Sequence, residues 1–100
     1  MALVIYARRA RADLKNVAEY IAQESGSRDI AKRFLHSVNR RCQAYAAQPQ
    51  SAELRPELGL GIRSFTVHSY IVFYQERRVG IDVLRVIHSS RDWASLWEAD

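Results

Sequence analysis

Between Tyr6 and Ile87 the spacing of hydrophobic residues changes once, from a helical to a strand-like period. Between Tyr6 and Pro49 the apolar side chains recur every three or four positions, which places them on one face of a helix. Beyond Gly61, short runs rich in β-branched and aromatic residues follow one another closely, which is typical of strands. Helices grouped before strands predict an α+β fold rather than an alternating α/β fold.

The helical part divides at Ser25-Gly26. Gly26 suits the left-handed residue that ends a helix, Ser27 is a good N-cap for the next helix, and Asp29 lies in that helix's first turn. The second helix ends at Pro49 and has a basic flank made of Lys32, Arg33, His36 and Arg40. Two helices with so short a link predict an antiparallel helical hairpin.

The predicted strands lie on both sides of this hairpin. They are Leu3–Tyr6, Ile62–Val67, Tyr70–Gln75 and Val79–Ile87, the last three joined by hairpin turns into an antiparallel meander. Gln48–Leu60 reads as a loop, and Asp92–Ala99 as a short C-terminal helix. The expected architecture is therefore two helices on a sheet of three or four strands.

The last strand is apolar on both faces. By the two-residue period, Ile81, Val83 and Ile87 should point one way and Leu84 and Val86 the other. Because a helical hairpin covers only one face of a sheet, the other face needs a cover, and a partner chain is the simple inference. The alternative is that the C-terminal tail folds back over it.

Composition limits the class of protein. One hundred residues, 48% of them hydrophobic, predict a single domain over residues 1–100. The lone Cys42 allows no disulfide within the chain, and no Cys/His spacing predicts a metal site. Without a membrane-spanning run or a signal peptide, we expect a cytoplasmic protein. The net charge of +4 comes almost entirely from arginine and suits nucleic acid, a nucleic-acid enzyme or an acidic partner.

Residues that could carry chemistry gather late in the chain. No phosphate-binding loop, paired-carboxylate motif or nucleophile motif is present, and no cofactor is expected. The candidates are Arg63, Arg85, His88 and Arg91. His88 could act as acid or base while arginines stabilise a phosphorane-like charge, as in a metal-free ribonuclease. Alternatively, His88 is a local hydrogen-bonding residue at the end of a strand.

The tail after the last strand has two interpretations as well. Trp93 and Trp97 could anchor a protein partner, because tryptophan is common at interface hot spots, or they could pack the tail on the core. Arg91-Asp92 could form a binding rim, or Asp92 could cap the terminal helix.

Four stretches in this order resemble the RelE/ParE superfamily of toxins from type II toxin–antitoxin systems. They are Ala10–Ile21, Glu57–Phe65, Tyr70–Tyr74, and Ile81–His88 followed by Arg91-Asp92. The resemblance implies two N-terminal helices on a mainly antiparallel sheet and an antitoxin that wraps the toxin. It also implies a role in plasmid stabilisation, with operator DNA bound only through the antitoxin.

The superfamily divides by target, and this sequence is closer to ParE, whose members inhibit DNA gyrase by binding. The sequence Arg85-Val86-Ile87-His88 is similar to the ParE side, and no lysine follows Lys32. The binding residues expected on this reading are Arg63, Arg85, His88, Arg91, Trp93 and Trp97. The alternative is a RelE-like endoribonuclease that cuts mRNA on the ribosome, with Arg63 and His88 as its catalytic pair. A member that binds its antitoxin but has lost toxicity is a third possibility.

Overall fold

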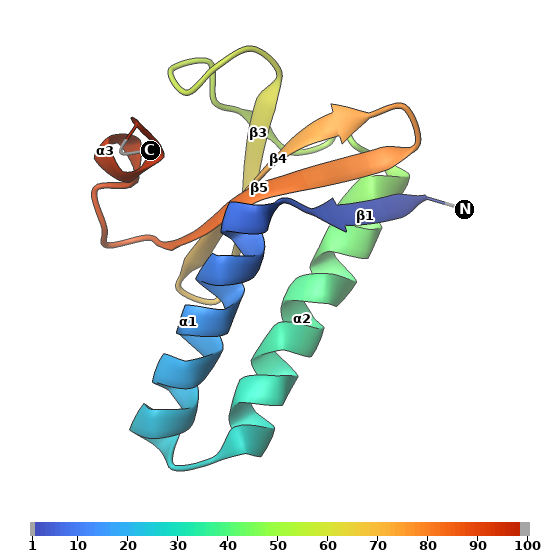
Figure 1. The fold of residues 1–100 in the computed structure, drawn as a ribbon. Coiled ribbons are helices and arrows are strands. Elements are labelled where there is room, and N and C mark those ends of the chain that lie inside the picture. The colour runs from blue at the N-terminus through green and yellow to red at the C-terminus, as the bar shows by residue number, and fades with distance from the viewer. Residues whose placement is uncertain (1, 99–100) are drawn as a thin grey trace.

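A computed structural model describes residues 2–98 of the chain, without the side chain of residue 98. In chain order the elements are β1 (Leu3–Tyr6), α1 (Arg8–Ser25), α2 (Arg28–Ala47), β2 (Glu53–Leu54), β3 (Ile62–Val67), β4 (Tyr70–Arg77), β5 (Gly80–His88) and α3 (Trp93–Glu98) (Figure 1). The predicted α+β class is confirmed. Ala99, the predicted end of the last helix, lies outside the described residues.

The sheet has five strands in the order β1-β5-β4-β3-β2. β3, β4 and β5 form the predicted antiparallel meander, and β1 pairs with β5 in parallel. The prediction of three or four strands is wrong because of β2, which pairs with β3 inside the expected loop. Both residues of β2 are exposed, so this strand has no hydrophobic period that would mark it in the sequence.

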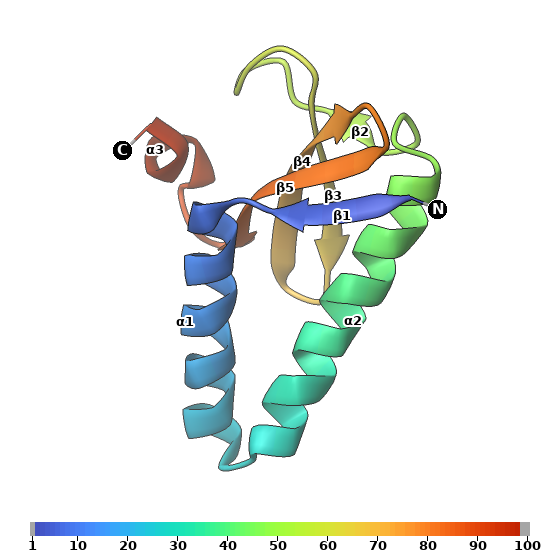
Figure 2. The same ribbon diagram turned by 45° about the vertical axis from the view of Figure 1, so that its right-hand side comes forward.

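The helical hairpin forms as predicted. Gly26 follows α1 with a φ of 69°, in the left-handed region, and the chain turns there. The Ser27 hydroxyl then accepts a hydrogen bond from the Ile30 backbone N–H at 3.3 Å, which caps α2. α1 and α2 meet at this turn and diverge toward the sheet, and their connected ends extend well past it (Figures 1 and 2).

The turn between β4 and β5 is shorter than predicted. β4 continues to Arg77 and β5 begins at Gly80, because backbone pairing extends beyond the last apolar residues. Gly80 has a φ of 103° and lies opposite Leu3 of β1. A Cβ atom at this position would collide with the Leu3 backbone, so only glycine lets β1 approach β5 this closely.

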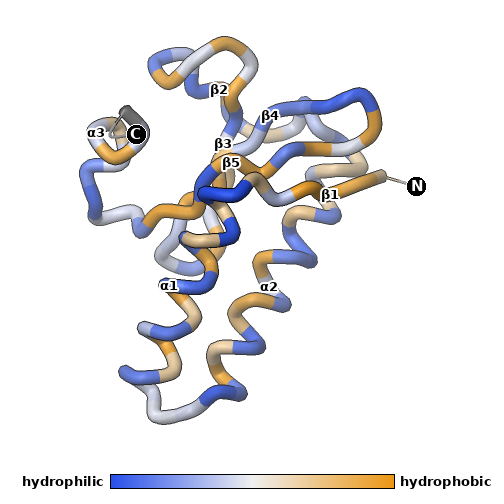
Figure 3. The backbone as a smooth tube through the Cα atoms, viewed as in Figure 1, coloured by the Kyte–Doolittle hydropathy of each residue, from blue (hydrophilic) through white to orange (hydrophobic). Residues whose placement is uncertain are grey.

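The main core lies between the helical hairpin and one face of the sheet, which we call the helix face. Its buried side chains include Phe34, Val38 and Cys42 from α2, and Tyr74 and Val83 from the sheet. Along both long helices, hydrophobic and hydrophilic segments alternate in step with the helical turns (Figure 3). None of the helices in residues 2–98 is long and apolar enough to cross a membrane.

The opposite face of the sheet, which we call the α3 face, is covered by the chain's own tail. Ile62, Ile71, Phe73 and Ile87 are buried there, and Trp93, Leu96 and Trp97 pack against them. The inference that this face needs a partner chain is therefore wrong. The alternative interpretation, that the tail folds back over the sheet, is confirmed.

A β-bulge in β5 changes which residues face which core. Tyr74 pairs with Val83 and Phe73 pairs with Arg85, so Leu84 is an extra residue in β5. Val86 consequently joins Val83 on the helix face, while Leu84 and Ile87 lie on the α3 face. The predicted placement of Val86 and Ile87 is wrong, because the bulge inverts the two-residue alternation beyond it.

Candidate functional site

Asp13 replaces a strand neighbour along the edge of β5. β1 ends opposite Val83, where the Ala7 backbone N–H donates to the Val83 carbonyl at 2.8 Å. The chain then turns into α1, and the Asp13 carboxylate accepts the Val86 backbone N–H at 2.9 Å. The carboxylate thus satisfies a donor that would otherwise be left unpaired where β1 stops.

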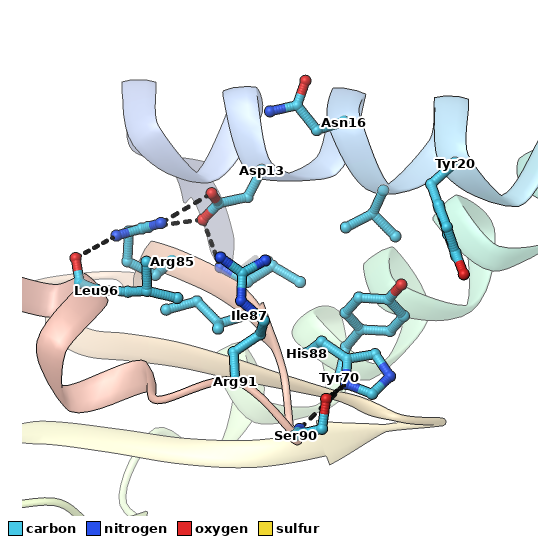
Figure 4. Close-up of a pocket in the computed structure, with 12 residues that line it drawn as sticks. Asp13, Asn16, Tyr20, Tyr70, Arg85, Ile87, His88, Ser90, Arg91 and Leu96 are labelled. Carbon is cyan, nitrogen blue, oxygen red and sulfur yellow. Dashed lines mark hydrogen bonds and ion pairs between the residues drawn. The ribbon is translucent and has the colours of Figure 1, made fainter.

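The same carboxylate holds Arg85 in a forked ion pair. Arg85 Nε and a terminal nitrogen donate to the two Asp13 oxygens at 2.7 and 3.0 Å, and the side chains are only 12% and 15% exposed. Arg85 also donates to the Leu96 carbonyl of α3 at 3.2 Å (Figure 4). This predicted binding residue therefore joins α1, β5 and α3, which makes it a positioning residue.

His88 lies at the end of β5, and its ring is oriented by two neighbours. Its Nδ1 accepts the Ser90 backbone N–H at 3.1 Å, and the Ser90 hydroxyl lies 2.7 Å from the same nitrogen. Since an amide N–H can only donate, the proton of the neutral ring lies on Nε2. The Tyr70 ring meets His88 edge-on, with the ring centres 5.0 Å apart. The interpretation of His88 as a local hydrogen-bonding residue matches this geometry.

A groove of about 690 Å³ runs between α1 and the end of β5, and we call it the α1–β5 groove. Val17, Val86, Ile87 and Leu96 contribute its apolar surface. Its polar residues are Asn16, Tyr20, Tyr70, His88, Ser90 and Arg91, together with the Asp13–Arg85 pair (Figure 4). Such a groove can receive a side chain whose polar end meets hydrogen-bond donors around an apolar floor.

Two tyrosine hydroxyls lie at one end of the groove. The hydroxyls of Tyr20 and Tyr70 point toward the same end of the groove (Figure 4). Burial, and secondarily Tyr20, raises the pKa of Tyr70, so its hydroxyl keeps its proton at neutral pH. Arg91 is exposed, and no ion pair within residues 2–98 involves it.

Arg63 lies at a different corner of the sheet. It pairs with Tyr74, whereas His88 pairs with Tyr70, so the two residues flank β4 four positions apart. At the usual rise per residue, four positions separate the two residues by about 13 Å along the direction of β4. One Arg63 nitrogen donates to the Gln50 and Ala52 carbonyls at 3.1 and 2.7 Å, which fixes the segment before β2. The structure therefore does not bring Arg63 and His88 together.

Trp93 and Trp97 both pack on Phe73, with ring centres 5.5 and 5.3 Å from it. The Arg55 guanidinium lies 5.5 Å from the centre of the Trp93 ring. The Asp92 side chain accepts from the Ser95 backbone N–H at 3.3 Å, as predicted for a cap of the terminal helix. Both tryptophans thus belong to the contact between tail and sheet.

Sequence reasoning did not select Asp13, Asn16 and Tyr20 as site residues. Asp13 lies within Ala10–Ile21, the first stretch of the family resemblance, and it meets Arg85 across 72 positions of the chain. No local pattern links residues so far apart. Within residues 2–98, no group of three or more His, Cys, Asp or Glu side chains is placed to hold a metal ion.

The family model described as "ParE toxin of type II toxin-antitoxin system, parDE" matches residues 4–93. The chain belongs to the ParE toxin family. The matched range includes Arg63, Arg85, His88 and Arg91 and stops before Trp97. The predicted superfamily, and the ParE side of it, are confirmed.

A solved structure supports the ParE fold. A chain titled "Chromosomal ParDE TA system from P. aeruginosa" superposes with a TM-score of 0.71. The two sequences are 20% identical over 88% of this chain and 96% of that one. No curated protein matches the sequence at a significant level.

Proposed function

We propose that this ParE family member is a single toxin domain that inhibits DNA gyrase by binding it. The observation that carries the proposal is the separation of the nuclease candidates. Arg63 is held by backbone carbonyls at one corner of the sheet and His88 lies at another. Metal-free cleavage of a phosphodiester needs the acid–base group and the charge-stabilising group on the same phosphate. Binding requires no such convergence.

The α1–β5 groove is the part of the surface we assign to the target. Arg91 and Tyr20 are exposed at its rim, and Tyr20 retains 58% of its surface. An exposed arginine and an exposed tyrosine beside an apolar floor are typical of interface hot spots. Trp93 and Trp97 act indirectly, by keeping α3 and its Leu96 in place beside the groove.

A cognate antitoxin neutralises the toxin in this proposal, as in the system named for the family. β1 supports such a partner, because it is the edge strand of the sheet and two of its apolar side chains are exposed. Leu3 and Ile5 retain 48% and 40% of their surface, and Val79 beside them retains 48%. An apolar sheet edge is a common docking place for a second chain. The complex would act in the cytoplasm.

The test is a gyrase supercoiling assay with the purified chain, with and without excess antitoxin. We expect inhibition that antitoxin reverses. Arg91→Glu should weaken inhibition at least tenfold, since it reverses a charge at the interface. The matched charge reversal Arg78→Glu, at an exposed position in the β4–β5 turn, should leave inhibition unchanged.

Unimpaired supercoiling in the presence of folded protein would overturn the proposal. The RelE-like alternative would then be tested on translating ribosomes, with Arg63→Ala and His88→Ala as the first variants. A true acid or base at His88 should reduce mRNA cleavage by about two to four orders of magnitude when replaced.

A further inference from the structure

The outer face of α2 carries a row of basic side chains, which includes the basic flank predicted from the sequence. We call it the α2 basic stripe, and it consists of Arg28, Lys32, Arg33, His36 and Arg40, all exposed. Their spacing of three, four and seven positions keeps them on one side of the helix. The opposite side of α2 is buried against the core through Phe34, Val38 and Cys42.

The stripe is not neutralised by the protein itself. No ion pair within residues 2–98 involves any of its four lysine and arginine side chains. Asp29 is the single acidic residue in the sequence of α2, and it lies three and four positions before Lys32 and Arg33, on the same side of the helix, so the stripe keeps a surplus of positive charge. Arg41 differs from the stripe because its guanidinium lies over the rings of Tyr45 and Phe65, at 5.9 and 5.6 Å. Like charges on neighbouring turns repel, so an anionic partner would relieve this cost.

The chemistry of the stripe favours nucleic acid over protein. Protein interfaces have an apolar core, whereas interfaces with DNA are more polar and strongly positive. The exposed large hydrophobic residue of α2 is Ile30, which projects to one side of the stripe and retains 45% of its surface. The aromatic residues Phe34 and Tyr45 lie on the core side of α2. Single strands are usually bound by stacking bases on exposed aromatic rings, so the stripe suits a duplex.

The dimensions agree with a phosphate backbone. Arg28 and Arg40 are separated by twelve positions of a continuous helix, about 18 Å at the usual rise. One strand of duplex DNA carries a charge about every 3.4 Å, so this length faces about five phosphates. The connected ends of α1 and α2 extend beyond the sheet, which leaves this part of α2 open to a large partner (Figures 1 and 2).

We propose that the α2 basic stripe binds the phosphate backbone of double-stranded DNA without sequence preference. The surface is separate from the α1–β5 groove, and the proposal does not depend on gyrase being the target. It is also distinct from operator recognition, which we assign to the antitoxin, since phosphate contacts position a protein on DNA but read no sequence.

The test is the salt dependence of binding to a labelled duplex of about 20 base pairs, measured by fluorescence anisotropy on the full chain. Four phosphate contacts predict a slope of about −3.6 for log K against log salt. Affinity should then fall about 150-fold between 50 and 200 mM salt. The double variant R33Q/R40Q should reduce the slope to about −1.8 and weaken binding at 50 mM salt by about tenfold or more.

R8Q/R11Q is the matched control, because it removes the same charge from exposed positions of α1. It should keep the slope of the unaltered chain. The proposal is overturned if R33Q/R40Q binds duplex DNA with an unchanged slope. It is also overturned if R33Q/R40Q and R8Q/R11Q lose the same amount of affinity for the duplex. If R33Q/R40Q bound duplex DNA normally but lost binding to an acidic antitoxin, the stripe would be assigned to a protein partner instead. Tighter binding of a single strand than of the duplex would also contradict it.

Discussion

The two faces of the sheet are covered by elements of very different strength. The helix face is covered by α1 and α2, with 18 and 20 residues, which are joined by a capped turn and continue directly from β1. The α3 face is covered by one helix of six residues. A helix that short is not stable by itself in water, so α3 depends on what it touches.

The main contacts of α3 involve its two tryptophan rings and the Leu96 carbonyl. Trp93 and Trp97 pack on Phe73, and Arg9 and Arg85 both donate to the Leu96 carbonyl, at 3.4 and 3.2 Å. The α1–β5 groove lies where the two coverings meet, because α1, β5 and Leu96 all line it. The helix face therefore holds the larger of the two cores, while α3 contributes Leu96 to the lining of the groove.

The largest loss of stability should come from Asp13→Ala. Asp13 connects α1 to β5 directly, and it connects α1 to α3 through Arg85. The substitution leaves Arg85 and the Val86 backbone N–H without their partner in a site that is mostly buried. Breaking such a pair costs about 3–5 kcal/mol of unfolding free energy. Chemical denaturation measures this loss. A loss below about 1 kcal/mol would show that the Asp13 carboxylate is not needed to hold α1, β5 and α3 together.

Alkaline pH should destabilise the packing on the helix face. Burial raises the pKa of the Cys42 thiol from 9.0 to about 11, and burial also raises the pKa of Tyr6. A raised pKa means that the unfolded chain loses its proton first, so stability is complete below pH 9 and falls as pH rises from about 9 to 11. A rise in the Cys42 pKa from 9.0 to about 11 corresponds to about 2–3 kcal/mol of unfolding free energy.

Denaturation curves at several pH values test this expectation. Cys42→Ala should flatten the decline between pH 9 and 11, whatever its effect on stability at pH 7. An equally steep decline in this variant would assign the alkaline loss to Tyr6, which is partly buried, and Tyr74, which is buried; burial is the main cause that raises the pKa of each.

The α3 face should open without the helix face. Trp97→Ala removes a ring that packs on Phe73 but is itself only partly buried, so we expect a loss of about 1–2 kcal/mol, below the range for a fully buried aromatic side chain. Hydrogen exchange should speed up at α3 amides and stay slow at α2 amides. Equal acceleration in α2 would mean that the two faces unfold as one unit.

The smallest effect should come from Asp82→Ala. Asp82 pairs with Arg77 at 2.9 Å, but both side chains are more than a third exposed, at 38% and 37%. Exposed pairs contribute about 0–1 kcal/mol. Thermal unfolding of Asp82→Ala beside Asp13→Ala compares an exposed with a buried carboxylate in the same protein, and similar losses would contradict the distinction.

The candidate site could be predicted only in part. Arg85, His88 and Arg91 lie within seven positions of one strand and its exit, so their proximity follows from the chain itself, and they do line one groove. Arg63 belongs to another strand, and its distance from His88 depends on which residues of β4 lie between them. Strand register is a tertiary property, and no spacing in the sequence reveals it.

The sequence by itself determined the elements whose causes are local. The helical period of α1 and α2, Gly26 at their turn, Ser27 as a cap and the runs of β3, β4 and β5 each depend on residues a few positions apart. Only the tertiary structure decided the bulge at Leu84 and the pairing of Asp13 with Arg85. These depend on which backbone groups remain unpaired after the sheet assembles, a competition between segments that are distant in the chain.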